Sequence, residues 1–309
     1  MLNIVVVGSF VVGLTIRVPR KPVLGEGLIG DLFDMGPGGK GTNQAIAAAR
    51  LGAQVHLVAC VGEDEFADMA FRLYAREGID AGHIHRIPGV NTGVGFVTLL
   101  PSGENWIVGH LGANQQMRPE HVDAAEALIA QSDIVMTQFE VPLETMARAM
   151  QLGRKHGAMT ILNPAPGKTV QPELLAHVDL LTPNESETRI LLGLAPDDPT
   201  PTLELARHLL DLGVQRIVVT QGKHGALIVT SEGSEEVPAI AVQALDVTGA
   251  GDSFNAALAV GLGEGMTLRD AVGHATYAGA YTTTHLGVIN GLPTRAALEA
   301  FKRSTSSGV

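Results

Sequence analysis

The sequence contains a single cysteine, Cys60, among its 309 residues. One cysteine cannot form an intrachain disulfide, so the fold has to be stable without disulfide cross-links. The lack of disulfides is typical of proteins of the reducing cytosol. Cys60 lies in the apolar run 55–61, where a thiol is expected to be buried and unreactive. We therefore expect a cytoplasmic protein whose cysteine takes no part in chemistry.

Positive charge is also scarce. The 21 Lys and Arg residues are outnumbered by 32 Asp and Glu residues, which gives a formal net charge of -11. Such a surface repels phosphate backbones and anionic lipids, which argues against nucleic-acid and membrane partners. No apolar stretch approaches the roughly 20 residues that a spanning helix needs. Residues 1–8 lack the basic region and cleavage site of a signal peptide, and they are expected to form a buried strand.

Aromatic residues make up only 4% of the chain, whereas glycine occurs 37 times. Short β-branched runs alternate with helical segments along most of the sequence. The expected strands are residues 4–7, 55–61, 134–136, 160–162, 180–182, 217–220 and 226–229, and helices are expected at 42–51 and 66–77. This alternation predicts an α/β fold with a mostly parallel sheet, in which ligands bind at the carboxyl ends of the strands.

Residues 11–35 and 91–110 interrupt this alternation. Both stretches combine alternating hydrophobicity with several glycines and prolines, a pattern that favours antiparallel strands. We expect them to combine into a small sheet that covers the site as a lid, with ordinary surface hairpins as the alternative. The α/β core would then comprise residues 1–10, 36–90 and 111–309.

The strongest chemical signal is the segment 246–254, where Gly249, Ala250 and Gly251 precede Asp252 at the start of a helical run. Small residues at a helix start leave backbone N–H groups unpaired, and the helix dipole favours negative charge there. Asp252 in the first turn could accept the proton of a hydroxyl that attacks a phosphorus atom. The pattern predicts phosphoryl transfer to an alcohol. The alternative is that Asp252 only complements the helix dipole.

A second glycine-rich segment, residues 35–43, leads into a helix. Gly39 allows close approach of a ligand to the backbone, while Lys40 and Asn43 supply hydrogen-bond donors. Gly41 follows Lys40 where a P-loop requires Ser or Thr, so the segment is not a P-loop. Residues 8–13 likewise lack the dinucleotide-binding pattern, which argues against a nicotinamide oxidoreductase.

Residues 182–187 follow a strand and open a helix. Their spacing places Asn184 and Glu187 on one helical face, and oxygen-bearing side chains hold Mg²⁺, often through water. The same spacing is typical of a helix N-cap with its capping-box partner. Both interpretations remain open at this point.

Together and in this order, the motifs resemble the ribokinase family, the PfkB-type carbohydrate kinases. The resemblance extends over nearly the whole chain and includes Gly8-Ser9, 38–44, Gly103-Glu104-Asn105, 112–114, 163–166, 182–185 and 249–252. It implies a three-layer α/β sandwich with a small β-sheet lid, ATP as co-substrate, and Mg²⁺ and K⁺ as cofactors. It also implies a homodimer formed through the lids.

The resemblance implies a role for each matching residue. Asp252 would be the catalytic base, and Gly249, Ala250 and Gly251 would form the anion hole. The sugar would contact Gly39, Lys40, Asn43, Glu140 and Asp252. The nucleotide would contact Asn184, Thr220, Gln221, Gly222, Lys223, His224, Gly225 and Gly251. Asn184 and Glu187 would hold Mg²⁺ through water, and the monovalent cation would be held by Asp246, Thr248, Thr282, His285, Gly287 and Gly291.

The sequence departs from the family where the sugar is clamped. The family typically has an Asp and an Asn at the positions that are Gly13 and Val11 here. A buried hydroxyl left without a partner costs roughly 1–3 kcal/mol. We expect an ATP-dependent sugar kinase with D-ribose as the first candidate substrate, and a deoxy-sugar, another carbohydrate or a nucleoside as alternatives. The alternative to an enzyme is a sugar sensor, which would bind the sugar without catalysis.

Overall fold

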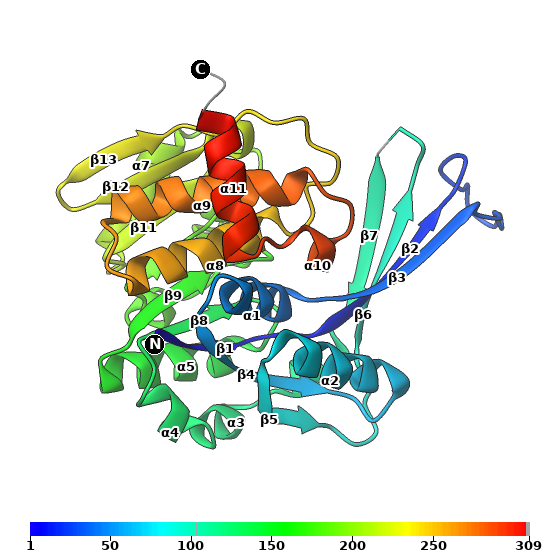
Figure 1. Cartoon of the computed structure of the whole chain (residues 1–309), viewed down its shortest axis with the longest axis horizontal. Helices are drawn as coiled ribbons and strands as arrows, with labels where there is room; N and C mark the ends of the chain where they lie inside the picture. Colours follow the sequence, from blue (N-terminus) through cyan, green and yellow to red (C-terminus); the bar gives the residue numbers. More distant parts are fainter. Residues whose placement is uncertain (103, 307–309) are drawn as a thin grey trace.

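The computed structural model describes residues 1–102 and 104–306, so Gly103 of the matched motif lies outside the described residues. A nine-stranded sheet with the order β13-β12-β11-β10-β9-β8-β1-β4-β5 forms the centre of the molecule (Figure 1). The strands are β1 (Asn3–Val7), β4 (Gln54–Val61), β5 (Asp80–Arg86), β8 (Ile134–Gln138), β9 (Met159–Asn163), β10 (Leu180–Leu181), β11 (Arg216–Thr220), β12 (Ala226–Thr230) and β13 (Gly233–Val237).

The expected mostly parallel sheet is confirmed. Every pairing from β5 to β11 is parallel, and only the pairings of β12 with β11 and β13 are antiparallel. The inner strands are mostly apolar, as expected for strands that are buried on both faces. In β1, for example, the side chains from Ile4 to Val7 are fully buried.

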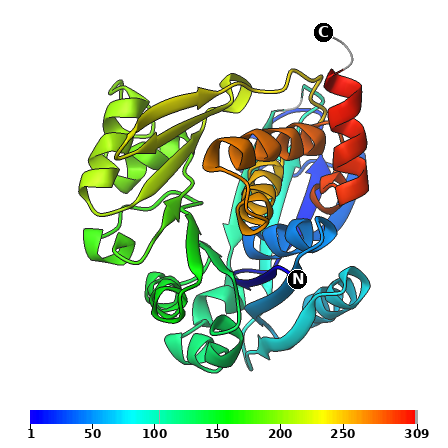
Figure 2. The ribbon, with the colours of Figure 1, turned by 60° about the vertical axis from the view of Figure 1, so that its left-hand side comes forward.

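Helices cover both faces of this sheet, which gives the three layers that the resemblance implies (Figure 2). Ile4 and Val6 point into one core, which is closed by α1 (Lys40–Arg50), α2 (Glu65–Glu77), α8 (Ala250–Gly263), α9 (Leu268–Thr283), α10 (Val288–Gly291) and α11 (Arg295–Ser306). Val5 and Val7 point into the other core, which is closed by α3 (Pro119–Asp123), α4 (Glu126–Ile129), α5 (Leu143–His156), α6 (Glu185–Leu191) and α7 (Thr202–Asp211).

A separate four-stranded sheet extends from the body of the molecule (Figure 1). Its order is β3-β2-β6-β7, with β2 (Val11–Arg17), β3 (Leu32–Gly38), β6 (Gly93–Leu99) and β7 (Asn105–His110). The expectation of antiparallel strands is right for the hairpins β2–β3 and β6–β7 but wrong for the central pair β2–β6, which is parallel. The two strands run the same way because β1 and β5, which precede them, are both strands of the parallel part of the central sheet.

The glycine-rich segment 35–43 contains almost no loop. Strand β3 continues to Gly38, past the expected lid boundary at residue 35, and α1 already begins at Lys40. Gly39 alone connects them, with φ of 95°. A Cβ atom at Gly39 would lie 2.9 Å from the backbone nitrogen of Val11, so both its conformation and its surroundings require glycine.

The first turn of α1 packs directly on the backbone that follows β1. A Cβ atom on Gly41 would lie 2.3 Å from the nitrogen of Ser9 and 2.6 Å from the Cα of Gly8. The carbonyl of Ser9 accepts hydrogen bonds from the Thr42 nitrogen (2.9 Å) and from Thr42 Oγ1 (2.8 Å). Two glycines therefore allow the helix to begin in contact with the end of a central strand.

Cys60 is fully buried, as expected. Burial raises the pKa of its thiol to about 12, so very little reactive thiolate is present at neutral pH. Within residues 1–102 and 104–306, no helix is long and apolar enough to cross a membrane.

We expect Gly41→Ala to lower the free energy of unfolding by about 3 kcal/mol, because the added methyl group would displace backbone atoms of Gly8 and Ser9. Gly273→Ala in α9 is the matched control, since among the described residues no atom outside the local helix backbone lies within 4 Å of a Cβ atom at Gly273. Alanine there should be neutral or should stabilise the helix by up to about 1 kcal/mol. Urea denaturation measures both variants, and parent-like stability of Gly41→Ala would show that the contact is dispensable.

Candidate active site

The predicted site residues gather at the carboxyl edge of the central sheet. Strands β1 and β8 are neighbours there, but the chain continues from β1 towards β4 and from β8 towards β9, in opposite directions across the sheet. Ligands of open α/β sheets bind at such a switch point. Ser9 follows β1 at this place and Glu140 follows β8, while the first turns of α1 and α8 lie close by.

The first turn of α8 forms the glycine-rich part of the site. Gly249 is the N-cap of the helix with φ of 83°, and a Cβ atom there would lie 2.7 Å from Cγ1 of Val288. At Gly251, by contrast, a Cβ atom would have no neighbour within 4 Å in the described part of the chain. The helix therefore begins tightly packed at Gly249 and open at Gly251, where its first N–H groups lack intrahelical partners.

Asp252 lies in the first turn of α8, as the sequence predicts, and only 6% of the residue is exposed. Two amides of α1 hold its carboxylate. Nδ2 of Asn43 donates to Oδ2 at 2.8 Å, and Nε2 of Gln44 donates to Oδ1 at 3.1 Å. Asn43 Oδ1 is buried and has no hydrogen-bond partner among the described residues. A buried acceptor beside a carboxylate suits a ligand that brings hydroxyl groups.

Glu140 and Lys40 meet at the first residue of α1. Glu140 Oε2 accepts hydrogen bonds from the backbone nitrogen of Lys40 at 2.8 Å and from the hydroxyl of Ser9. The same hydroxyl accepts from the backbone nitrogen of Gly41 at 3.2 Å. Glu140 is therefore a partly buried carboxylate at a helix N-terminus, where the dipole stabilises its charge.

Lys40 is surrounded by negative charge. Burial lowers the pKa of its ammonium group, but the carboxylates of Asp252, Glu140 and Glu187 outweigh burial, and the net pKa is raised above the usual value for lysine. Lys40 therefore remains protonated at neutral pH and well above it. The site contains a permanent cation among three carboxyl groups.

Asn184 and Glu187 form the capping box that was one of the two interpretations of their spacing. Asn184 Oδ1 accepts from the Glu187 nitrogen at 2.8 Å, and Glu187 Oε2 accepts from the Asn184 nitrogen at 2.8 Å. Burial raises the pKa of Glu187, with the charge of Asp252 adding to it, although Lys40 and the backbone bond act in the opposite direction. A divalent cation would relieve this repulsion, so the oxygen-rich pair fits Mg²⁺ held through water.

A pocket of about 450 Å³ lies beside this helix start. It is lined by Asn184, Glu185, Ser186, Arg189, Pro196, Asp197, Thr220, Gln221 and Gly222. Four of the predicted nucleotide contacts, Asn184, Thr220, Gln221 and Gly222, are thus in one cavity. Lys223, His224 and Gly225 belong to the same turn, around η3 (Gly222–His224), but do not line the pocket.

The predicted cation ligands lie beside Gly249, in the loop before α8, at the end of α9, and around α10. Asp246 Oδ1 accepts from the Thr248 nitrogen at 2.9 Å, and Asp246 Oδ2 accepts from the Gly287 nitrogen at 3.2 Å. A Cβ atom on Gly291 would lie 3.1 Å from the Thr282 carbonyl oxygen and 3.5 Å from the Cβ of His285. Backbone carbonyls at helix ends and in loops fit a monovalent cation such as K⁺.

Two polar residues of the site were not predicted to contact ligands. Ser9 bridges Glu140 and the start of α1, and Gln44 contacts Asp252. Both lie inside the matched motifs, Gly8-Ser9 and 38–44, so their positions in those motifs were the available signal. Their contacts could not be predicted because they depend on how α1 packs against β1 and β8.

Comparisons with known proteins agree with this geometry. Residues 1–295 match the family model described as pfkB family carbohydrate kinase. The chain is 37% identical to the ribokinase of Haemophilus influenzae over 95% of this chain and 96% of that protein. It is 37% identical to a deoxyribokinase of Salmonella typhi over 82% of this chain and 83% of that protein.

A solved structure shares the same arrangement of sheets and helices. The ribokinase of Arabidopsis thaliana, complexed with ribose and ATP, superposes with a TM-score of 0.90 and 28% identity over 97% of this chain and 99% of that one. The three-layer α/β fold with a small second sheet is thereby confirmed. The family match covers both the first turn of α1 and the first turn of α8, where the site lies. The chain belongs to the pfkB family of carbohydrate kinases.

Proposed function

We propose that this chain transfers the γ-phosphoryl group of ATP to a hydroxyl of a pentose, with D-ribose as the first candidate and ribose 5-phosphate as its product. The observation that carries the proposal is the carboxylate of Asp252, which two amides hold at the open N-terminus of α8. The similarity to ribokinases, one of them solved with ribose and ATP, supports the same substrates.

In the proposed reaction the acceptor hydroxyl lies against Asp252, which takes its proton as the oxygen attacks the γ-phosphorus in line. The backbone N–H groups of Gly249, Ala250 and Gly251 stabilise the charge on the transferring group. The ammonium of Lys40 adds positive charge, and Asn43 Oδ1 accepts from a neighbouring sugar hydroxyl. Gly39 and Glu140 border the sugar on the side of α1.

The nucleotide is proposed to occupy the pocket beside α6, with contacts from Asn184 and the turn 220–225. Mg²⁺ held through water by Asn184 and Glu187 would neutralise phosphate charge during transfer. K⁺ among the carbonyls of the loops around Asp246 and Gly287 would add positive charge behind the anion hole.

Asp252→Asn tests the role of the base. We expect turnover to fall by about 1,000-fold or more, because an amide cannot accept the hydroxyl proton, while ATP affinity stays within about twofold. Asp270→Asn is the matched control, since Asp270 occupies the first turn of the neighbouring helix α9 and bonds only to the N-cap Thr267 in the described contacts. ADP release measures turnover, and near-normal turnover of Asp252→Asn would contradict the mechanism.

One face of the small sheet carries a row of residues without side chains. Gly13 pairs with Gly36 and Gly95, and Gly95 pairs with Gly109, so one row across all four strands consists of glycine. The next row on the same face is Val11 and its partner Gly38, where a Cβ atom would lie 3.9 Å from Asn43 Oδ1. This face is therefore directed at the site and offers a sugar no side-chain acceptor at Gly13.

We accordingly keep a deoxy-sugar, another carbohydrate or a nucleoside as alternative substrates, because each has fewer hydroxyls or more bulk on the side of the lid. The discriminating experiment measures ADP release with Mg²⁺-ATP and K⁺ against D-ribose, 2-deoxy-D-ribose, other pentoses and hexoses, small polyols and nucleosides. The highest kcat/KM for ribose supports the first candidate. Binding without turnover for every compound would support the sugar sensor instead.

Gly13→Asp should shift the substrate preference. Within the described part of the chain, a Cβ atom at Gly13 would have one non-neighbouring atom within 4 Å, the Gly36 carbonyl oxygen at 3.6 Å, so an aspartate fits without displacing the backbone. The new acceptor should raise kcat/KM for D-ribose relative to 2-deoxy-D-ribose by about tenfold, which corresponds to one additional hydrogen bond. An unchanged ratio for the two sugars would show that residue 13 does not face the substrate.

The opposite face of the small sheet is apolar and exposed. Met35, Phe96 and Val108 form one row on it, with exposures of 44%, 50% and 71%, and Phe33 lies two residues along at 64%. Exposed apolar surfaces of this kind mark interfaces. We propose that two copies of the chain pair through these faces, so that each small sheet is a lid over its own site.

Phe96→Asp should prevent this pairing, because it would place a charge in the middle of the proposed interface. The parent is expected to elute as a dimer in size-exclusion chromatography with light scattering, and the variant as a monomer. A monomeric parent at all concentrations would contradict the proposed dimer.

The proposal also includes a cytoplasmic location and small-molecule partners only, without nucleic acid or membrane. The net charge of -11 and the single, fully buried Cys60 support it.

A further inference from the structure

Gln44 uses both its donor and its acceptor in hydrogen bonds beside Asp252. It is fully buried, and its Nε2 donates both to Asp252 Oδ1 and to Asn163 Oδ1, at 3.1 Å each. Its Oε1 accepts from Nε2 of Gln138 at 2.6 Å. The carboxylate only accepts hydrogen bonds, so the NH₂ group of Gln44 must face it and the oxygen must face Gln138.

The partners of Gln44 are the last residues of two central strands. Gln138 ends β8 and is fully buried, and Asn163 ends β9 and is 7% exposed. Asn163 is fixed in turn, because its Nδ2 donates to the Thr182 carbonyl at 2.9 Å. The orientation of Gln44 is therefore set by the central sheet rather than by its own helix alone.

Asn43 and Gln44 contact the same carboxylate but differ in their other atoms. Asn43 has a buried oxygen without a partner in the described structure, whereas both ends of the Gln44 amide are bonded to the protein. A ligand hydroxyl can be accepted by Asn43 Oδ1 with no loss of an existing bond. Displacing Gln44 would break three buried hydrogen bonds at once.

We infer that Gln44 is a positioning residue that keeps Asp252 Oδ1 fixed to the sheet and leaves Oδ2 as the atom that receives the proton. The inference rests on the proposed kinase function. In the transfer step the acceptor hydroxyl gives its proton to Oδ2, its oxygen forms the new bond to the γ-phosphorus, and the bond from that phosphorus to the bridging oxygen of ADP breaks. Asn43 Nδ2 then moves from Oδ2 to the substrate.

The neutral charge of Gln44 matters because the site is already acidic. The charged and titratable groups that interact there with Asp252 are Lys40 from α1 and Glu187 from α6, and Glu140, after β8, acts on Lys40. A carboxylate at position 44 would lie within hydrogen-bond distance of Asp252. Two carboxylates so close share a proton, and the base form is then reached only at higher pH.

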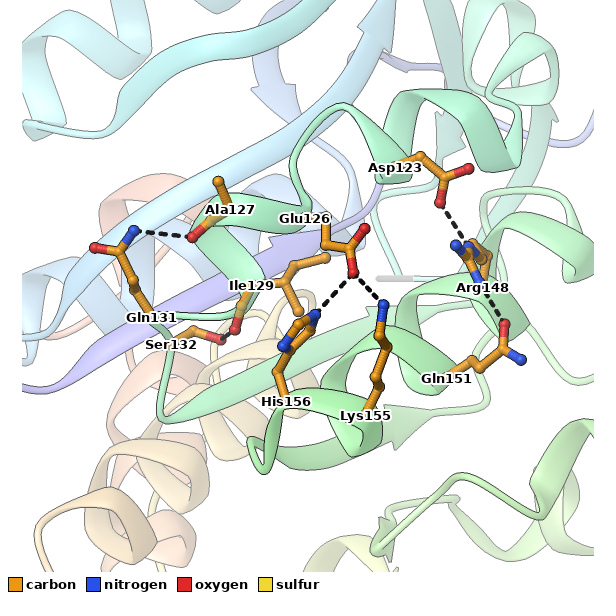
Figure 3. Close-up of polar contacts among 10 residues, drawn as sticks. All are labelled: Asp123, Glu126, Ala127, Ile129, Gln131, Ser132, Arg148, Gln151, Lys155 and His156. Atoms are coloured by element: carbon orange, nitrogen blue, oxygen red, sulfur yellow. Dashed lines mark hydrogen bonds and ion pairs between the residues drawn. The ribbon is translucent and has the colours of Figure 1, made fainter.

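The test uses Gln44→Met, which removes the donor at similar size, and Gln44→Glu, which keeps the acceptor for Gln138. We expect Gln44→Met to lower kcat by about tenfold or more with KM for ATP changed less than about twofold. We expect Gln44→Glu to move the acid limb of the pH–rate profile upward by about one pH unit or more. Gln151→Glu on α5 is the matched control, because it adds the same charge at an exposed residue that accepts from Arg148 (Figure 3).

Gln138→Leu provides a second, independent measurement. If Gln138 acts on the reaction through Gln44, its substitution lowers kcat in the parent but has little further effect in Gln44→Met. If Gln138→Leu instead lowers kcat only by disturbing the structure, its full effect on kcat should also be seen in the double variant with Gln44→Met. Thermal unfolding of each variant shows whether it is folded at the assay temperature, and Gln44→Glu remains decisive if Gln44→Met is not.

Parent-like kcat in Gln44→Met, an unmoved pH profile in Gln44→Glu, or full additivity with Gln138→Leu would each overturn the inference. Asp252→Asn, measured in parallel, separates this failure from that of the proposed function. If Asp252→Asn is inactive while the Gln44 variants behave as the parent, only the positioning role is wrong. If Asp252→Asn retains turnover, the proposed base itself is wrong.

Discussion

The site depends on the contact between two glycines, Gly8 at the end of β1 and Gly41 in the first turn of α1. A Cβ atom on Gly8 would lie 2.5 Å from Gln138 Oε1 and 2.6 Å from the Cα of Gly41. Without side chains at these positions, the helix start lies directly on the carboxyl edge of the sheet. Only then can Lys40 donate its backbone N–H to Glu140, and Gln44 reach the ends of β8 and β9.

The position of the α1 start at the sheet edge also affects how an acidic site can bind the negatively charged phosphates of a nucleotide. The chain has a net charge of -11, and the described site contains the carboxyl groups of Asp252, Glu140 and Glu187 around the ammonium of Lys40. A second ammonium, that of Lys168, acts on Glu140. Oriented backbone N–H groups in the first turns of α1 and α8 add positive potential locally. Glu140 already uses one of these N–H groups, on Lys40, and the Ala250 N–H donates to the Val247 carbonyl at 3.3 Å. At Gly251 a Cβ atom would meet no described atom outside the local helix backbone within 4 Å.

The sequence predicted those features that depend on local chemistry. Small residues before Asp252 indicated a helix N-terminus with an acidic residue in its first turn, and alternating short strands and helices indicated the mostly parallel sheet. Features that depend on packing were missed or misjudged. The parallel pairing of β2 with β6 follows from the direction of β1 and β5 in the central sheet, and no pattern within either hairpin contains that information. In the sequence Gln44 has no feature that distinguishes it from other helix residues. Its role depends on the contacts with the ends of β8 and β9, which only the structure shows.

The spacing of Asn184 and Glu187 shows why two interpretations of one pattern need not exclude each other. Both residues form a capping box, yet Glu187 is also a partly buried acid whose pKa burial raises and which lies in the field of Lys40 and Asp252. The cap fixes the orientation of the pair, and that fixed orientation is what a water-mediated metal site would require.

The central claim is that Asp252, held by α1, receives the proton of the acceptor hydroxyl. A crystal structure of the chain with the preferred sugar and a non-hydrolysable ATP analogue tests it most directly. The account predicts the acceptor hydroxyl within hydrogen-bond distance of Asp252 Oδ2, Gln44 still bonded to Oδ1, and the γ-phosphate analogue at the N-terminus of α8. A sugar bound with no hydroxyl near Asp252, or a γ-phosphate away from that helix start, would contradict the account.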